Sequence, residues 1–254
     1  MSDRVLIEEM TWQEVRDAQA DGRTTAAFAC GAVEQHGPHL PTGTDTYLGT
    51  ALAERAARLA GNTLVAPTLR PGLSEHHMHF PGSFTVRPST FIALVEDYCT
   101  SLARQGFQRV VVFSSHGGNT DTLRAHAPTV ARALHPDCQV VFAGDWFQGI
   151  MQTLSEREIP LGRAGAHGGY TETSMMLAAQ PALVDMERAE PGRSDDEFYL
   201  PENVGRSQME AFIHGIQTQS PNGVLGDPLG STAEVGEELL DVASEALVEI
   251  LRTG

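Results

Sequence analysis

The sequence has few cysteines, and their spacing excludes two common kinds of scaffold. Three occur among the 254 residues, Cys30, Cys99 and Cys138, and they lie far apart in the chain. Their number is odd and no CxxC pair is present, so neither a disulfide framework nor a zinc site built from thiolates is expected. We interpret all three as small buried hydrophobic side chains.

Basic residues are also scarce. Lys and Arg together number 17 against 33 Asp and Glu, which gives a formal net charge of −16. Such an acidic surface repels the phosphates of nucleic acids and of anionic membranes, so neither is expected as a partner. The net charge does not identify a substrate, because one local site can have the opposite sign.

Long apolar runs are missing as well. No stretch approaches the roughly 20 apolar residues that a membrane-spanning helix needs. The beginning of the sequence, MSDRVLIEEMTWQEV, is acidic and lacks the apolar core of a signal peptide. A GxGxxG turn, which would favour a dinucleotide-dependent oxidoreductase, does not follow the first expected strand. We therefore expect a soluble, cytoplasmic protein.

What the sequence does contain is the composition of a packed globular domain. Hydrophobic residues make up 41% and charged residues 20%, as is usual for such domains. At this length we expect one large domain over residues 1–254. Residues 189–206 are polar, acidic and proline-bearing, and we interpret them as a surface excursion of that domain.

Strands and helices are expected to alternate along the chain. Strands are predicted at four apolar runs, residues 24–30, 63–66, 109–113 and 139–143. Helices are predicted at residues 47–59, from Pro88 onward, at residues 120–134 and after a capping box at residues 231–234. This alternation predicts an α/β fold with three layers, in which helices cover both faces of a mostly parallel sheet.

Two polar clusters directly follow predicted strands. GAVEQHGPHLPTGTD (residues 31–45) follows the first strand, and SSHGGN (residues 114–119) follows the third. Ligand sites of parallel sheets lie beyond the carboxyl ends of the strands. Both clusters are therefore expected at the same edge of the sheet.

These clusters contain the ligand types that divalent metals accept. Glu34, His36 and Asp45 supply two carboxylates and an imidazole, and His116 supplies a second imidazole, a set that suits Zn²⁺, Mn²⁺ or Fe²⁺. The excess of carboxylate favours a two-metal centre with one bridging carboxylate. Asp45 could instead cap the helix that is predicted to start after it, and His39 is interpreted as an exposed loop imidazole.

A third cluster is AHGGYTETS, residues 166–174. His167 could move a proton near the metals, and Glu172 could be a metal ligand or a general base. Glu172 could also simply pair with the positive end of the helix that begins there. Tyr170 is a candidate substrate contact.

A fourth cluster is SEHHMHFPGS, residues 74–83. His76, His77 and His79 could bind a metal, but consecutive side chains of an extended segment diverge, so substrate contact or loop packing is the stronger interpretation. His77 and His79 are therefore candidate substrate contacts. Trp146, just past a predicted strand, could line the same site or could cover the core.

Together the four clusters resemble the creatininase (creatinine amidohydrolase) family. The string EQHGPHLPTGTD is specific to it, and the matching motifs run in the expected order from Val33 to Ser174. The resemblance implies an α/β layered fold, two divalent metal ions per subunit and a homo-oligomer, commonly a hexamer. It also implies that Glu34, Asp45 and His116 bind one metal, and that His36 and the bridging Asp45 bind the other.

The same resemblance assigns catalytic roles. His167 matches the histidine that carries protons to the leaving nitrogen, and Glu172 matches the glutamate of the same motif. The implied reaction is hydrolysis of a C–N amide bond by a water molecule that two metals activate. We expect a small substrate, most simply a cyclic amide or imide. A formamide, a peptide, or a non-catalytic role in metal binding are the alternatives.

One position departs from creatininase itself. That enzyme has His-Tyr-Glu where this chain has His-Gly-Gly at residues 116–118, and its glutamate is a ligand of the second metal. Gly118 has no side chain that could replace it. Either Glu172 or water must complete the second site, or that metal binds weakly. We therefore expect an HGGN-type member of the family rather than creatininase.

Overall fold

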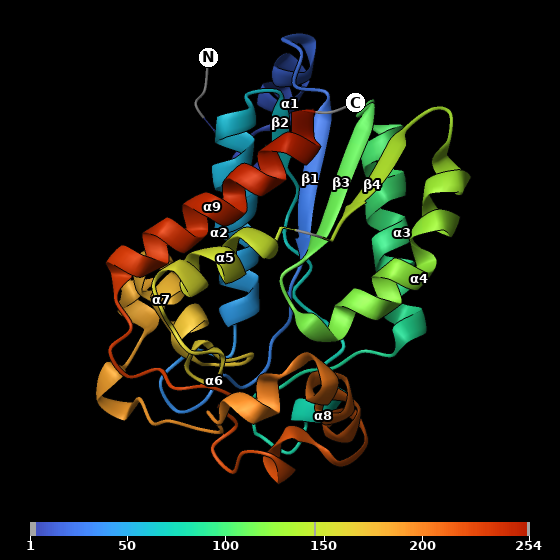
Figure 1. Ribbon diagram of the computed structural model, residues 1–254. Coiled ribbons are helices and arrows are strands. Elements are labelled where there is room, and N and C mark those ends of the chain that lie inside the picture. The colour runs from blue at the N-terminus through green and yellow to red at the C-terminus, as the bar shows by residue number, and fades with distance from the viewer. Residues whose placement is uncertain (1–3, 145, 253–254) are drawn as a thin grey trace.

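A parallel β-sheet forms the middle of the computed structural model, which describes residues 4–144 and 146–252. Within these residues the sheet has four strands in the order β2-β1-β3-β4, and every neighbouring pair is parallel (Figure 1). The strands are Thr25–Cys30 (β1), Thr63–Val65 (β2), Arg109–Ser114 (β3) and Gln139–Ala143 (β4).

Helices cover both faces of this sheet. Successive residues of a strand point to opposite faces, so Ala27, Val111 and Phe113 belong to one hydrophobic core, whereas Phe28 and Val112 belong to the other. The first core is completed by α2 (Thr44–Ala60), α5 (Gln148–Glu156), α7 (Tyr170–Ala179) and α9 (Ala233–Arg252). The second is completed by α1 (Trp12–Ala20), α3 (Pro88–Arg104) and α4 (Gly117–Leu134). The predicted three-layer α/β fold is confirmed.

The remaining described elements are short, apart from α8. They are η1 (Ile7–Glu9), η2 (Glu75–His77), α6 (Leu161–Ala164), η3 (Pro181–Leu183), η4 (Met186–Arg188), η5 (Asp196–Tyr199), α8 (Pro201–His214) and η6 (Ile216–Thr218). Figure 1 shows α8 beyond the ends to which the strands point. Helix α8 therefore lies at the edge of the sheet where a ligand site is expected.

Two helices start earlier than their apolar patterns predicted. Helix α2 begins at Thr44 after Gly43, so Asp45 lies inside its first turn and the interpretation of Asp45 as the capping residue was wrong. Helix α4 begins at Gly117, directly after His116. The first difference places Asp45 within the first turn of a helix, and the second places His116 directly before one.

The start of the last helix differs from the predicted capping box. The backbone N–H of Val235 donates to Oγ1 of Thr232 at 3.3 Å, so Thr232 caps α9. The hydroxyl of Ser231 instead donates to the carbonyl of Tyr170 at 3.3 Å. The prediction chose the wrong one of two adjacent hydroxyl residues, because both types are common at this position.

The interpretation of residues 189–206 as a surface excursion was only partly right. Most of the segment before η5 is exposed, but Phe198 and Tyr199 are buried against Ile216 and Leu225. Helix α8 packs against η2, η5 and η6. The segment therefore encloses a space at the end of the sheet.

All three cysteines are buried and form no disulfide, as expected. Within the described ranges, no helix is both long and apolar enough to cross a bilayer.

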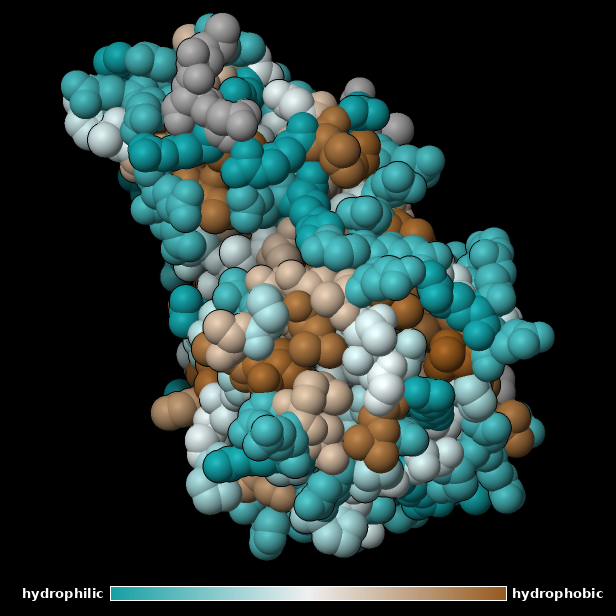
Figure 2. Space-filling model, turned by 90° about the vertical axis from the view of Figure 1, so that its left-hand side faces the viewer, coloured by the Kyte–Doolittle hydropathy of each residue, from teal (hydrophilic) through white to brown (hydrophobic). Residues whose placement is uncertain are grey.

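Figure 2 shows the face on the left of Figure 1, where hydrophilic residues surround apolar ones. Ion pairs lie on the surface between α2 and α9, for example Arg55 with Glu237 at 2.6 Å, but exposed pairs contribute little to stability.

Candidate metal centre

Neighbouring strands bring two of the polar clusters together. Cys30 at the end of β1 lies in register with Ser114 at the end of β3. Beyond them, the side-chain amide of Asn119 donates to the carbonyls of Cys30 and Gly31 at 3.2 and 3.0 Å and accepts from the N–H of Leu73 at 3.0 Å. Asn119 is fully buried, so this amide joins three loops at the edge of the sheet. Its supporting role had not been predicted, although it is the last residue of SSHGGN.

His116 lies between two carboxylates. Its Nε2 is 3.3 Å from Oε2 of Glu34, and its Nδ1 is 3.3 Å from Oδ2 of Asp45. The carbonyl of Leu73 lies 3.2 Å from Nε2, so Nε2 donates, and Nδ1 is the nitrogen that can give up its hydrogen to bind a metal ion. One ligand atom from each of Glu34, Asp45 and His116 lies within 4.8 Å of the other two. These three side chains form a first group that could hold a metal ion.

A second group shares Asp45. Nε2 of His36 is 3.3 Å from Oδ1 of Asp45 and 3.9 Å from Oε2 of Glu172. Nδ1 of His36 lies 3.1 Å from the carbonyl of Glu34, which fixes a hydrogen on Nδ1 and makes Nε2 the nitrogen that can give up its hydrogen to bind a metal ion. Oε2 of Glu172 also accepts the N–H of Gly168 at 2.5 Å. The ligand atoms of His36, Asp45 and Glu172 again lie within 4.8 Å of one another.

The atoms at the meeting point of these groups lack ordinary partners. Both carboxylate oxygens of Glu34, Oδ2 of Asp45 and Nε2 of His36 are buried and make no hydrogen bond within the described part of the chain. Buried polar atoms are almost always hydrogen-bonded, because leaving them unpaired costs free energy. Convergent, unpaired oxygen and nitrogen atoms are the donor set that a borderline divalent cation accepts. The residues therefore fit a metal centre.

The charges of these groups are strongly coupled. Burial raises the pKa of Glu34 to about 7, although His116 opposes the shift. Burial lowers the pKa values of both imidazoles, but the carboxylates outweigh it and raise the pKa of His36 to about 10 and that of His116 to about 9. Burial raises the pKa of Asp45, but His36 and His116 outweigh it and lower that pKa below its ordinary range. A metal ion would take the place of protons on the imidazoles.

His167 lies directly beside this centre. Its Nε2 is 2.5 Å from the carbonyl of Gln35 and therefore donates to it, which leaves the lone pair on Nδ1, 3.6 Å from Oε1 of Glu34. Burial, and then the nearby His36, lower the pKa of His167 well below its usual value. His167 is thus a neutral imidazole whose free nitrogen points to the centre.

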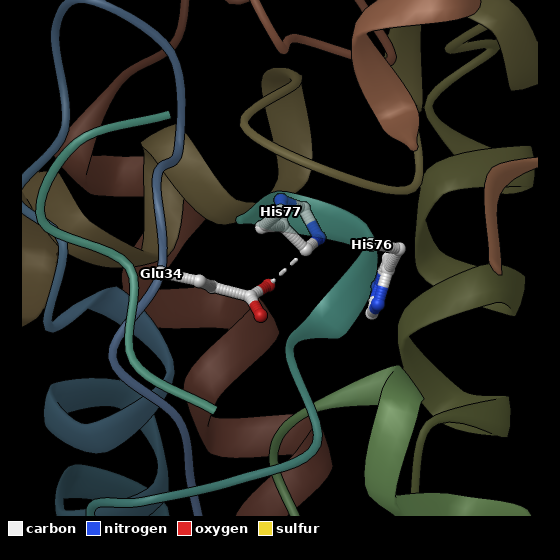
Figure 3. Close-up of side chains that lie close together, drawn as sticks. All are labelled: Glu34, His76 and His77. Carbon is white, nitrogen blue, oxygen red and sulfur yellow. Dashed lines mark ion pairs between the residues drawn. The ribbon is translucent and has the colours of Figure 1, made fainter. Parts of the chain in front are cut away.

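The histidine cluster on η2 is closer to the centre than its sequence suggested. Because Glu75–His77 is a 3-10 turn rather than an extended segment, two consecutive histidines reach the same region. Nε2 of His77 is 3.3 Å from Oε1 of Glu34, and His76 lies on the other side of the turn (Figure 3). Glu34, His76 and His77 also form a group within 4.8 Å. His79 is exposed and contacts the ring of Phe80.

The second glycine of His-Gly-Gly is required by space. A Cβ atom at Gly118 would lie 2.4 Å from the carbonyl oxygen of Leu73 and 2.5 Å from Nε2 of His116. A Cβ atom at Gly117 would meet no heavy atom of the described residues within 4 Å. Gly118 thus allows the loop before η2 to lie against the start of α4. In this position the carbonyl of Leu73, in that loop, accepts the hydrogen bond from His116.

Three other residues singled out in the sequence make contacts outside this centre. His39 is buried, and its Nε2 lies 2.8 Å from Oγ1 of Thr173, so its interpretation as an exposed imidazole was wrong. Trp146 donates from Nε1 to the carbonyl of Ser114 at 3.2 Å and packs with the first core. The ring of Tyr170 lies under the guanidinium of Arg163.

A large cavity opens beside the centre. Its volume is about 940 Å³, and Glu34, Asp45, His116, His167 and Glu172 line one part of it. The remaining wall includes Phe198, Tyr199, Phe212, Ile216, Leu225, Arg87 and Arg124. Much of this wall comes from η5, α8 and η6, which the sequence did not connect with the site. Of the predicted substrate contacts, His77 lines the cavity, whereas the other three are not among its lining residues in the described chain, and their contact with substrate stays a prediction.

Comparisons with known proteins identify the family of the chain. The model of the family "Creatininase: Creatinine amidohydrolase" matches residues 8–251. A creatinine amidohydrolase from Pseudomonas putida is 30% identical over 99% of this chain and 98% of its own length. A mycofactocin precursor peptide peptidase from Mycobacterium ulcerans is 33% identical over 82% of this chain and 77% of its own length. The solved structure of a mutant creatininase of Zn-Zn type has a TM-score of 0.80 and 28% identity, over 99% of this chain and 98% of that one. The chain therefore belongs to the creatininase family of amidohydrolases.

Proposed function

We propose that this protein is a metal-dependent hydrolase that cleaves a C–N amide bond of a small substrate at the edge of its sheet. The observation that supports it most strongly is the set of buried, unpaired atoms on Glu34, Asp45 and His36. Glu34, Asp45 and His116 would hold one divalent ion, and His36, Asp45 and Glu172 the other, with Asp45 between them. Two such ions, when bound, would activate a water molecule at neutral pH and polarise the carbonyl of the substrate.

Glu172 provides the carboxylate that Gly118 lacks. Its Oε2 faces His36 at 3.9 Å, and the N–H of Gly168 holds that oxygen in place at 2.5 Å. Burial raises the pKa of Glu172, while His36 opposes the shift. Because the oxygen that Gly168 holds in place faces His36, we assign Glu172 to the second metal group rather than to proton transfer.

His167 is the residue that moves protons. Its neutral ring has a lone pair on Nδ1, which accepts a proton from the attacking water and returns it to the leaving nitrogen. The hydrogen bond from Nε2 to the carbonyl of Gln35 at 2.5 Å keeps the ring in this tautomer and stabilises the imidazolium that forms. A positioned acid–base group of this kind contributes roughly 10²–10⁴-fold to a rate.

The cavity leaves room for more than a single ring. At about 940 Å³ it is near the upper end of the roughly 300–1,000 Å³ that drug-sized ligands occupy. A cyclic amide or imide remains our first candidate, and a formamide is chemically equivalent. The volume and the exposed Arg87 in the lining favour a short peptide with an acidic end as the second candidate.

Metal removal followed by a substrate screen tests this function. The purified protein is stripped with a chelator, reloaded with Zn²⁺, Mn²⁺ or Fe²⁺, and assayed on cyclic amides, imides, formamides and short peptides. We expect ring opening, formate or a free amine to appear only in the reloaded samples. Turnover that survives complete metal removal would refute the proposal, and tight metal binding without any hydrolysis would indicate a non-catalytic relative.

The proposal extends to the assembly and location expected from the family resemblance. We propose a cytoplasmic homo-oligomer, most simply a hexamer. Light scattering coupled to size-exclusion chromatography measures the mass directly, and a monomeric mass would contradict this part of the proposal.

A further inference from the structure

Gln35 lies between the two principal ligand residues of its loop and is buried beneath them. Its exposed fraction is 6%. Three nitrogen or oxygen atoms surround the side-chain nitrogen Nε2: Nδ1 of His77 at 3.0 Å, Nε2 of His167 at 3.0 Å and the carbonyl of Gly223 at 3.1 Å. The amide thus contacts two histidines of the centre.

Backbone groups fix which way this amide points. Oε1 accepts the N–H of Gly37 at 2.8 Å, and Nε2 donates to the carbonyl of Gly223 at 3.1 Å. Exchanging oxygen and nitrogen would place two donors together at Gly37 and two acceptors together at Gly223. The atom that faces both histidines is therefore the nitrogen, and it can only donate.

The number of hydrogens then fixes the tautomer of His77. A primary amide has two hydrogens, and one of them is used by Gly223. His167 cannot accept the other at Nε2, because that nitrogen donates to the carbonyl of Gln35. The second hydrogen goes to Nδ1 of His77. The hydrogen of the His77 ring must then be on Nε2, which lies 3.3 Å from Oε1 of Glu34.

We propose that Gln35 is a positioning residue, which keeps the hydrogen of the His77 ring on Nε2, 3.3 Å from Oε1 of Glu34, where it attracts that carboxylate and leaves Oε2 toward the metal group with His116. This role rests on the proposed function, because it concerns the same centre. His77 is then a support for a ligand rather than a ligand. Such supports of metal ligands typically contribute about 10–100-fold to metal affinity.

Gly223 is shaped to the same amide. Its backbone has a φ of +79°, which L-residues with side chains rarely adopt. A Cβ atom there would lie 2.1 Å from Oε1 of Gln35 and 2.6 Å from its Nε2. The loop that contains Gly223 therefore closes directly onto Gln35, as expected if the orientation of this amide matters.

Nitrogen NMR of the histidine rings tests the tautomer without any change to the centre. Spectra of wild-type protein with and without Zn²⁺ would be assigned by comparison with His77→Gln. In both the zinc-free and the zinc-loaded spectrum, we expect the His77 ring to carry its hydrogen on Nε2 and to have an unprotonated Nδ1. A ring protonated on Nδ1, or a zinc-induced shift typical of direct ligation, would overturn the assignment.

The zinc affinity of the variant Gln35→Met tests whether this support contributes to metal binding. Methionine keeps the length of the side chain but can no longer donate to His77, so we expect zinc affinity to fall by about 10–100-fold. Gln139→Met is the matched control, because it removes a 2.7 Å bond from Arg109 at the opposite end of the strands. A folded Gln35→Met that binds zinc within about twofold of wild type overturns the proposal. Wild-type protein that binds no zinc refutes the proposed function instead, and the metal-free spectrum still decides the tautomer.

Discussion

Asp45 and His116 face each other at 3.3 Å, although one belongs to the first turn of α2 and the other precedes α4. Asp45 is shared by the two groups that could hold a metal ion, with His116 in one and His36 in the other. The relationship depends on the parallel pairing of β1 and β3, which starts both loops at the same edge. Changes to either loop are therefore expected to affect both groups.

Removal of His116 should abolish metal binding and activity together. In His116→Ala the first group loses its imidazole, so we expect zinc affinity to fall by more than about 100-fold, because removing a ligand costs more than removing its support. Competition with a chromophoric chelator measures this. His126→Ala, which changes an exposed histidine on the helix that follows His116, is the control, and equal affinity in the two variants would contradict the assignment.

Removal of His167 should separate metal binding from turnover. His167→Ala keeps the ligands of both groups, so we expect wild-type metal content and a kcat that is lower by roughly 10²–10⁴-fold. Metal analysis and steady-state kinetics on the true substrate give both values. A full hydrolysis rate would exclude His167 from proton transfer, and loss of metal would make it a ligand.

The two glycines of His-Gly-Gly should differ in their tolerance of a methyl group. Gly118→Ala would place Cβ 2.4 Å from the carbonyl of Leu73, so we expect a loss of about 1–3 kcal/mol in the free energy of unfolding and weaker zinc binding. Gly117→Ala has open space, and its stability should stay within about 1 kcal/mol of wild type. Chemical denaturation measures both, and equal effects would show that space is not the reason for glycine at position 118.

Metal binding should release protons and weaken in acid. The pKa values of His116 and His36 are raised to about 9 and about 10, so near neutral pH both imidazoles hold protons that a metal ion displaces. We expect the release of about two protons per centre from the imidazoles and a further fraction from Glu34, whose pKa is raised to about 7, with affinity falling as pH falls, because added protons compete with the metal. Calorimetry in two buffers of different ionisation enthalpy counts the protons. Binding without proton release would show that the imidazoles are not ligands.

The fold could be predicted from the sequence because its strands are short apolar runs between clear helices. Helix starts were less accurate: Asp45 and Gly117 lie within first turns, where polar and glycine residues hide the helical pattern. The exposed interpretation of His39 failed because its partner, Thr173, is distant in the chain. Local sequence gives no indication of such a contact.

The predicted ligand residues lie together in the structure, since strand ends of a parallel sheet share one edge. The missed features depend on contacts between segments. His76 and His77 reach the centre through a tight turn, and η5 and α8 enclose the cavity from a stretch that looked like surface. Gln35 was passed over between Glu34 and His36, because only its hydrogen-bond partners reveal its position.

The metal content of wild-type protein and of Glu172→Gln tests the central proposal most directly. Elemental analysis after dialysis against limiting free Zn²⁺ gives the number of ions per chain. We expect about two ions in wild type and about one in Glu172→Gln, because the variant keeps the group with Glu34 and His116 but weakens the one with His36. Less than about one tightly held ion per wild-type chain, with no metal-dependent hydrolysis, would contradict a two-metal amidohydrolase.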